Sequence, residues 1–299
     1  MNILSLRNVV KRYHNHTAVD DVSFEVPKGT IFGLLGPNGA GKTSLIRIIT
    51  TITGADSGQV YLDGEALNTL HPNQIGYMPE ERGLYKKMEV GEQLMYLAQL
   101  KGLSSAEARK KIKFWMEKFD ILSWWNKKIQ DLSKGMQQKV QFIATIVHDP
   151  KLIILDEPFS GLDPINTNLI KDEIHQLKEN GASILFSTHR MEQVEELCDR
   201  IVLINKGKII LDGPVDQIKN DYKEHLYKIK LEDSGSKIQS NELFDVYSQS
   251  DKELIVKISD KKNPNDVLKY LIDQDIQVHH FNEILPSLNE IFIKKENEQ

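Results

Sequence analysis

The chain has 299 residues, of which 40% are hydrophobic and 27% charged, and its formal net charge is -5. This apolar share can form a sizeable buried core, which excludes wholesale disorder, and the length suits one large domain with a smaller one. The single cysteine, Cys198, excludes an internal disulfide. No apolar run approaches the roughly 18–20 residues of a membrane-spanning helix, and the N-terminus lacks the apolar h-region of a secretory signal. We therefore expect a soluble, cytoplasmic chain.

The N-terminal segment has the pattern of strands that lead into a helix. Residues 4–13 and 22–26 alternate apolar and polar side chains, and residues 30–36 form a short apolar run with flanking glycines, as a buried strand does. From Lys42 onward the apolar residues recur at three- and four-residue spacing, which predicts an α-helix.

Between the buried strand and this helix lies GPNGAGKT, which matches the pattern G-x-x-x-x-G-K-[ST] in full. The pattern occurs by chance in about one in a hundred chains of this length, and its strand-to-helix context is the one that phosphate binding requires. Glycines let backbone N–H groups converge on phosphate oxygens, Lys42 reaches the β- and γ-phosphates, and the Thr43 hydroxyl ligates Mg²⁺. The predicted nucleotide-binding residues are Gly36, Pro37, Asn38, Gly39, Ala40, Gly41, Lys42, Thr43 and Ser44.

Residues 89–148 are expected to be mostly helical, within a helical subdomain of about residues 79–150. Ser104, with Glu107 three positions later, is a candidate capping box, and Ser133 can cap the next helix.

The same segment contains the three tryptophans of the chain, Trp115, Trp124 and Trp125. Two interpretations stay open. The rings can pack inside a small helical unit, or Trp124 or Trp125 can lie exposed and form part of a partner surface.

An apolar run at residues 152–155 predicts a buried strand that ends in Asp156 and Glu157. Asp156 would deliver a carboxylate to the Mg²⁺ shell, whereas Glu157 would polarise the attacking water as a general base. Alone, such a pair is equally consistent with a solvated turn. Together with the phosphate loop, it predicts the second half of a nucleotide site.

Asp163 followed by Pro164 predicts the start of a helix, and Gly181 predicts its end. Residues 182–189 and 200–210 then return to strand patterns. Strand and helix alternate around a helical insert, which predicts an α/β fold with a mainly parallel sheet.

Charge divides the chain into two parts. Residues 1–213 hold 26 basic and 26 acidic side chains, whereas residues 214–299 hold 12 Lys, 17 acidic residues and no Arg. The shift falls at Asp212-Gly213-Pro214, which has the chemistry of a turn, so we expect one domain over 1–213 and a second over 214–299. An acidic appendage on a balanced core argues against a nucleic-acid partner.

The acidic segment predicts a small α+β domain. Helical patterns cover residues 215–222, 263–275 and 286–295, and strand patterns cover residues 225–232, 253–259 and 276–284. Asn263 or Asn265 is the expected cap of the middle helix. His279 and His280 form a poor candidate metal site, because adjacent strand residues point to opposite faces.

Four segments together resemble the ATP-binding subunits of ATP-binding cassette (ABC) transporters: GPNGAGKT, LSKGMQQK at 132–139, SGLD at 160–163 and STH at 187–189. The resemblance covers residues 1 to about 213 in order and spacing. It implies a P-loop NTPase core, ATP and Mg²⁺ as cofactors, and ATP hydrolysis. It also implies a separate transmembrane permease that would hold the chain at the inner face of the cell membrane.

The resemblance assigns further residues. Tyr13 falls where the family stacks an aromatic ring on adenine, and His189 where a switch histidine contacts the γ-phosphate. Ser133 and Gly135 would contact the γ-phosphate bound by the opposite subunit, and Asp163 would communicate across that dimer. A homodimer or heterodimer would thus enclose two ATP molecules, and a lone chain should hydrolyse ATP poorly. In the family, a short helix of the permease inserts near the equivalent of residues 80–85.

Three positions depart from the usual family pattern. Lys134 and Met136 replace a Gly and a Gln in the signature LSGGQ, and the lysine either pairs with ATP phosphates or is simply solvated. Glu80 stands where the family has a Gln that senses Mg²⁺ and the attacking water. An ionised carboxylate can ligate Mg²⁺ but cannot donate a hydrogen bond, so we expect Glu80 to be a metal and catalytic residue with a changed role.

The segment PEERGLY is similar to subunits of sodium-extrusion and related multidrug or peptide exporters, which favours an exporter of sodium, a drug, a peptide or a lipid. One alternative is a soluble cassette ATPase that acts on ribosomes or nucleic acid, but such proteins usually carry two cassettes or a long coiled coil. A non-catalytic adaptor would lack Lys42 or Glu157, and both are present. The acidic domain would regulate the ATPase or brace its dimer.

Overall fold

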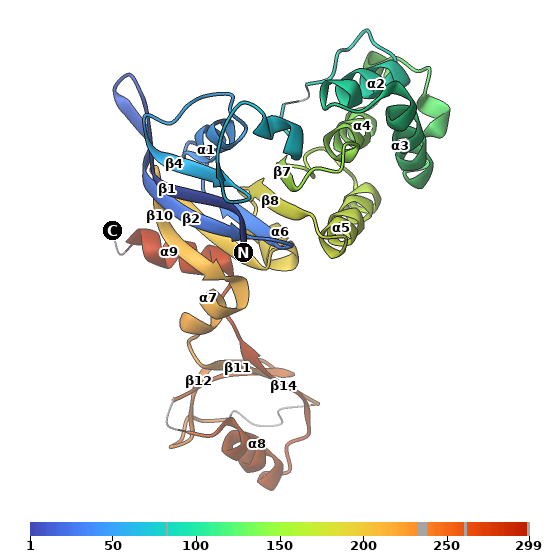
Figure 1. The fold of residues 1–299 in the computed structure, drawn as a ribbon. Coiled ribbons are helices and arrows are strands. Elements are labelled where there is room, and N and C mark those ends of the chain that lie inside the picture. Colours follow the sequence, from blue (N-terminus) through green and yellow to red (C-terminus); the bar gives the residue numbers. More distant parts are fainter. Residues whose placement is uncertain (82, 233–237, 260–261, 298–299) are drawn as a thin grey trace. The chain divides into compact units, whose positions relative to one another are not determined.

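A computed structural model describes residues 1–81, 83–232, 238–259 and 262–297, and it divides the chain into two compact units, Met1–Pro214 and Val215–Gln299 (Figure 1). Arg82, in the middle of PEERGLY, lies outside the described residues. Among the described residues, no helix has both the length and the apolar character needed to cross a membrane.

A six-stranded sheet forms the centre of the first unit, in the order β10-β9-β3-β8-β7-β6. All neighbouring strands pair in parallel except β9 and β10. The strands are β3 (Ile31–Leu35), β6 (Ile75–Met78), β7 (Leu152–Asp156), β8 (Ser183–Thr188), β9 (Arg200–Asn205) and β10 (Lys208–Pro214). Every residue of β3, β7 and β8 is buried, as expected for strands covered on both faces. The predicted α/β fold is confirmed, and the parallel order places the carboxyl ends of β3, β8 and β7 at one edge.

A second, antiparallel sheet has the order β2-β1-β4-β5. Its strands are β1 (Asn2–Tyr13), β2 (His16–Pro27), β4 (Ser57–Leu62) and β5 (Glu65–Ala66). The alternation of the first two strands was readable in the sequence, but their separation into another sheet was not. One buried cluster joins residues of both sheets to helix α1 (Lys42–Ile49), including Leu4, Phe24, Phe32 and Ile46. The phosphate loop therefore lies on a well-packed base.

Three helices lie together between β6 and β7 in the chain, as Figure 1 shows: α2 (Val90–Leu100), α3 (Ser105–Lys118) and α4 (Lys134–Ile146). Single 3-10 turns cover His71–Gln74, Leu122–Trp124 and Ile129–Asp131. Both predicted caps are confirmed. Ser104 and Glu107 form a reciprocal capping box on α3, and the Ser133 hydroxyl accepts from the Met136 backbone N–H at the start of α4.

The three tryptophans are at least partly buried within the helical subdomain. Trp115 is buried, and both Trp124 and Trp125 are half-buried, so the alternative in which one of them stands exposed is wrong. The Trp125 ring lies against Gly91, where an added Cβ would be 2.3 Å from Trp125 Cε2. The ring therefore requires a glycine on the facing helix.

Two further helices complete the unit, α5 (Pro164–Glu179) and α6 (Met191–Leu197). The Asp163 carboxylate accepts from the Asn166 backbone N–H at 2.9 Å and caps α5, and Gly181 has a φ of 92° after its end. Cys198 follows α6 and is buried, and its burial raises the pKa of the thiol.

The turn predicted at Asp212-Gly213-Pro214 is wrong. These residues belong to β10 and pair with β9, with Gly213 opposite Ile201 and Pro214 opposite Arg200. Pairing with the preceding strand in a hairpin outweighs the local turn tendency, and proline is tolerated here because β10 is an edge strand. The segment 200–210, expected as one strand, turns at Lys206 and Gly207, both of which have positive φ.

The second unit is a four-stranded antiparallel sheet with helices, in the order β12-β13-β11-β14. Its elements are α7 (Val215–Asp221), β11 (Leu226–Leu231), β12 (Phe244–Gln249), β13 (Glu253–Ile258), α8 (Pro264–Asp273), β14 (Val278–Ile284) and α9 (Leu288–Asn297). Asn263 caps α8, as one of the two predicted alternatives. Strand β12 was not predicted from the sequence. A separate core, with Ile229, Leu254, Val256 and Leu271 fully buried, makes this an α+β unit of its own.

Candidate active site

The phosphate loop links the end of β3 to the first turn of α1. Helix α1 begins at Lys42 with no side-chain cap and no acidic residue in its first turn, so its backbone N–H groups face outward without a competing anion. Gly41 has a φ of 112°, and a Cβ there would lie 2.2 Å from the Ala18 carbonyl oxygen. A Cβ at Gly36 would lie 2.1 Å from the Ile204 oxygen. Only glycine fits at both positions, and the resulting loop presents a ready anion site.

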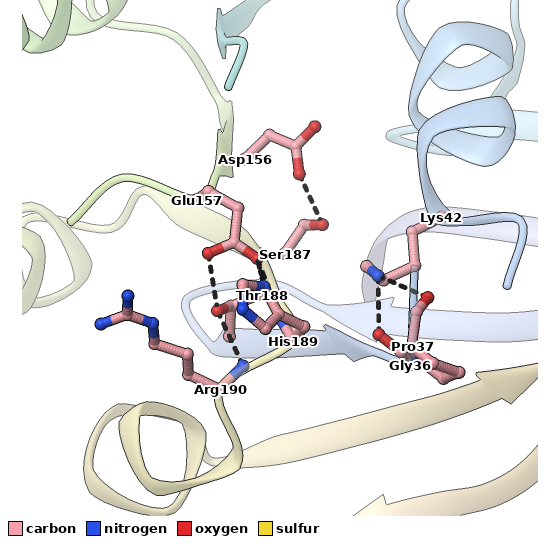
Figure 2. Close-up of polar contacts among 9 residues, drawn as sticks. All are labelled: Gly36, Pro37, Lys42, Asp156, Glu157, Ser187, Thr188, His189 and Arg190. Atoms are coloured by element: carbon pink, nitrogen blue, oxygen red, sulfur yellow. Dashed lines mark hydrogen bonds and ion pairs between the residues drawn. The ribbon is translucent and has the colours of Figure 1, made fainter. Parts of the chain in front are cut away.

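Lys42 lies folded over this loop. Its Nζ donates to the carbonyl oxygens of Gly36 at 2.7 Å and Pro37 at 3.1 Å, as Figure 2 shows. Burial lowers the pKa of Lys42, and the negative charges of Glu157, Asp156 and Glu80 oppose that shift. Phosphate oxygens in the loop would meet an ammonium group that is already held in place.

Asp156 ends β7 on the same edge of the sheet. Its side chain is buried, and the Ser187 hydroxyl donates to its Oδ1 at 2.8 Å. Burial raises the pKa of the Asp156 carboxyl, against the hydrogen bond from Ser187. A divalent cation would reverse such a shift, because it favours the ionised carboxylate.

Glu157 is held by the last residue of β8 and by the residue that follows it. The Thr188 hydroxyl donates to Oε2 at 3.0 Å, and the His189 backbone N–H donates to Oε1 at 2.8 Å (Figure 2). His189 Nδ1 lies 2.7 Å from the same Oε1. Glu157 also has a φ of 49°, an uncommon backbone for a non-glycine residue. Such local strain is typical of functional positions, and here it turns the carboxylate toward His189.

One cavity of about 240 Å³ brings most of the predicted residues together. Its lining consists of Tyr13, His16, Ala18, Asn38, Gly39, Ala40, Gly41, Lys42, Thr43, Ser44, Glu80, Asp156 and Glu157. On one side, the Lys42 ammonium group and the backbone N–H groups of the loop suit phosphate. On the other side, the carboxylate oxygens suit a hard cation.

Other predicted residues lie outside this cavity. Ser133 and Gly135 begin α4, and Asp163 caps α5. These two helix starts are close to each other, since a Cβ at Gly135 would lie 3.7 Å from the Gly161 carbonyl oxygen. The structure therefore presents a second group of motif residues, separate from the cavity of the same chain.

Sequence reasoning missed four residues of this region. His16 and Ala18 line the cavity from β2, and no motif marked them. Ser187 and Thr188 hold Asp156 and Glu157. Both lie in the STH segment, and their position next to His189 could have indicated that they belong to the site.

Comparisons with known proteins agree with this arrangement. Residues 19–160 match a protein family described as ABC transporter, and residues 213–295 match the C-terminal domain of proteins like the ATP-binding protein DrrA1-3. An uncharacterized ABC transporter ATP-binding protein of Bacillus subtilis, YhaQ, is 41% identical over 98% of this chain and 98% of its own length. The linearmycin resistance ATP-binding protein of the same organism is 37% identical over 71% of this chain and 69% of that protein.

Two similar solved structures each cover about three quarters of this chain. The structure of an ATP-binding subunit of an ABC transporter has a TM-score of 0.69 and 30% identity, over 74% of this chain and 93% of that one. An ATP-binding cassette solved in its ADP conformation has a TM-score of 0.64 and 28% identity, over 73% of this chain and 92% of the other.

Proposed function

Because the chain belongs to the ATP-binding subunits of ABC transporters, whose activity is ATP hydrolysis, we propose that it powers export through a separate transmembrane permease. One observation supports this site for ATP: a single cavity gathers Tyr13, residues 38–44 of the phosphate loop and the acidic residues Glu80, Asp156 and Glu157. The named relatives support the export direction. They include the linearmycin resistance protein and a lipopolysaccharide export ATP-binding protein of Haemophilus influenzae, 35% identical over 74% of this chain.

In this proposal the ATP phosphates bind residues 36–44, with Lys42 between the β- and γ-phosphates, and the adenine stacks on Tyr13. Thr43, Asp156 and Glu80 would hold Mg²⁺, since all three offer oxygen ligands in one cavity. When bound, Mg²⁺ neutralises charge that develops on the transferred phosphoryl group.

Glu157 would accept a proton from the attacking water. Its hydrogen bonds from Thr188 and from the His189 backbone hold the carboxylate in one orientation. His189, whose side chain is about half exposed, lies within hydrogen-bond distance of this carboxylate and would also contact the γ-phosphate.

The second group of motif residues supports a dimer. Ser133, Gly135 and Asp163 lie outside the cavity of their own chain, at the adjacent starts of α4 and α5. A second ATPase subunit, identical or related, would bring its own bound ATP against these helix starts. Backbone N–H groups at the N-terminus of a helix such as α4 suit a γ-phosphate.

The catalytic assignment is tested with Glu157→Gln and Lys42→Ala. We expect Glu157→Gln to lower ATP turnover by roughly a hundredfold or more, because general-base catalysis contributes about 10²–10⁴. It should still bind ATP and should trap a dimer. Lys42→Ala should abolish ATP binding. Steady-state ATPase assays, with bound nucleotide and mass measured after gel filtration, check both.

Glu117→Gln is the matched control, because Glu117 is exposed on α3 and away from the cavity. Undiminished turnover in Glu157→Gln would contradict its role as the base.

Export is tested on the complex with the permease that co-purifies with the full chain. After reconstitution with the ATPase face outward, external ATP should drive a labelled transport substrate into the vesicles. Na⁺, a fluorescent drug, a labelled peptide and a fluorescent lipid are the probes. ATP-driven loss of every accepted probe from preloaded vesicles would show import instead.

A further inference from the structure

Two buried glutamines of α4 hold loops that lie far apart in the sequence. Gln138 is 3% exposed, and its Nε2 donates to the Pro158 carbonyl oxygen at 2.7 Å. Gln141 is 4% exposed, and its Nε2 donates to the Pro79 carbonyl oxygen at 2.9 Å. Because residues three apart share a face of a helix, one face of α4 makes both contacts.

Each of these prolines is next to an acidic residue of the nucleotide cavity. Pro79 precedes Glu80, and Pro158 follows Glu157. Glu80 is itself exposed, so the backbone before it, rather than packing of its side chain, sets where the carboxylate lies. Gln141 thus contacts the residue directly before Glu80.

Tyr85, a few residues after Glu80, is also hydrogen-bonded to a helix. The Tyr85 backbone N–H donates to Oε1 of Gln93, a fully buried residue of α2, at 2.7 Å. Pro79 is therefore attached to α4, and Tyr85 is attached to α2.

Packing alone does not account for Gln141. Its Oε1 is buried and has no hydrogen-bond partner among the described residues. Leaving such an atom unpaired costs about 1–3 kcal/mol, which an apolar side chain of similar size would avoid. Among the described residues, the side-chain amide of Gln141 makes one hydrogen bond, to the Pro79 carbonyl oxygen.

We propose that Gln141 is a positioning residue for Glu80, and that Gln138 does the same for Glu157. Helix α4 begins at the Ser133 cap, and the positions of Glu80 and Glu157 then depend on the position of this helix. A shift of α4 when Ser133 and Gly135 engage a nucleotide would move the Pro79 and Pro158 carbonyls with it. The inference rests on the proposed roles of Glu80 in Mg²⁺ binding and Glu157 as base.

The test replaces the donor and keeps the volume, with Gln141→Met in the full-length chain. We expect the Mg²⁺ concentration for half-maximal ATPase activity to rise roughly three- to tenfold, the range that the loss of one hydrogen bond supports. Binding of ATP without Mg²⁺ should stay unchanged. Gln138→Met should lower kcat without moving the Mg²⁺ response, because it acts beside Glu157.

Thr145→Val is the matched control. Thr145 is equally buried on α4, and its hydroxyl donates to the Gln141 carbonyl oxygen within the helix. Gln141→Asn gives a second variant should Met disturb folding, which circular dichroism and thermal unfolding report. It keeps the amide but is one methylene too short to reach Pro79, so it should shift the Mg²⁺ response in the same direction.

A double-mutant cycle with Glu80→Ala decides whether Gln141 acts through Glu80. In the Glu80→Ala background, Gln141→Met should produce no further shift. An equal shift with and without Glu80, or the same shift in Thr145→Val, would overturn the inference and leave the proposed function standing. If Glu80→Ala by itself leaves the Mg²⁺ response unchanged, the metal role of Glu80 fails and this inference fails with it.

Discussion

Burial shifts the pKa values of two charged residues of the nucleotide cavity in opposite directions. It raises the pKa of Asp156 and lowers that of Lys42. Both shifts disfavour the charged forms. A phosphate beside Lys42 and a cation beside Asp156 would restore them, so ligand binding and the protonation of these two residues are linked.

His148 gives a pH-dependent stability that is independent of the nucleotide. Burial, with a smaller contribution from Lys101, lowers the pKa of His148 from 6.5 to about 4. Between these values the unfolded chain binds more protons than the folded one. The stability is therefore fully present above pH 6.5 and falls as the pH drops toward 4.

From pH 7.5 to pH 5, this residue should remove about 2 kcal/mol from the free energy of unfolding. Urea unfolding at the two pH values measures the loss, which should be smaller by that amount in His148→Gln. His175→Gln, at an exposed position of α5, serves as the control. Equal losses in the wild type and His148→Gln would contradict the prediction.

At the scale of residues, the motifs predicted which side chains meet in the cavity, because phosphate and Mg²⁺ chemistry demands particular groups at particular spacing. They could not predict Gln138 and Gln141. A glutamine within a helix is compatible with solvent, and its bond to a carbonyl about 20 or 60 residues away exists only in the folded chain. The assignments of Tyr13, Glu80, Ser133 and Asp163 to functions stay predictions.

Helix α2 illustrates how an element is held by contacts that local sequence does not reveal. The Gly91 backbone N–H donates to the Trp125 carbonyl oxygen at 2.9 Å, and the ring of Trp125 occupies the space beside Gly91. Arg109, on α3, lies over the same ring, with its Cζ 5.4 Å from the ring centroid. Trp125 thus connects α2 and α3.

Gly91→Ala should therefore destabilise the protein although alanine is the better helix former. Intrinsic propensity favours alanine by about 1 kcal/mol. The clash with Trp125 should outweigh it and lower the free energy of unfolding by roughly 1–3 kcal/mol. Thermal unfolding measures the change. Gly54→Ala, where an added Cβ meets nothing within 4 Å, is the control, and a raised Tm in Gly91→Ala would contradict the prediction.

The elements themselves were largely predictable, since caps and hydrophobic periodicity act over a few residues. The capping box of α3 and the buried strand β7 are examples. Prediction failed where hydrogen bonding between strands, and not the local sequence, decides the structure. Strand β10 includes Asp212-Gly213-Pro214 because β9 is available beside it, and β1 joins a separate sheet because β4 lies next to it.

At the scale of the whole molecule, the two units have separate cores, and the second holds the entire imbalance of charge. Every residue proposed for ATP binding lies in the first unit. A role of the second unit in regulation or in bracing the dimer stays a proposal from the sequence.

A chain that ends at Pro214 tests this role. We expect it to fold and to bind ATP with an unchanged Kd, because both the core and the cavity are complete. Its dimerisation or its ATP turnover should be reduced. Calorimetric titration, light scattering and ATPase assays measure the three quantities. Unchanged dimerisation and turnover would count against the proposed role.

Cys198 has a practical consequence for following this protein in motion. It is the only thiol of the chain, and burial with a raised pKa makes it a poor target for maleimides. The wild-type protein thus already behaves as a background with no reactive cysteine. A fluorophore or spin label introduced at one new surface cysteine would report on that site alone, without any prior replacement in the core.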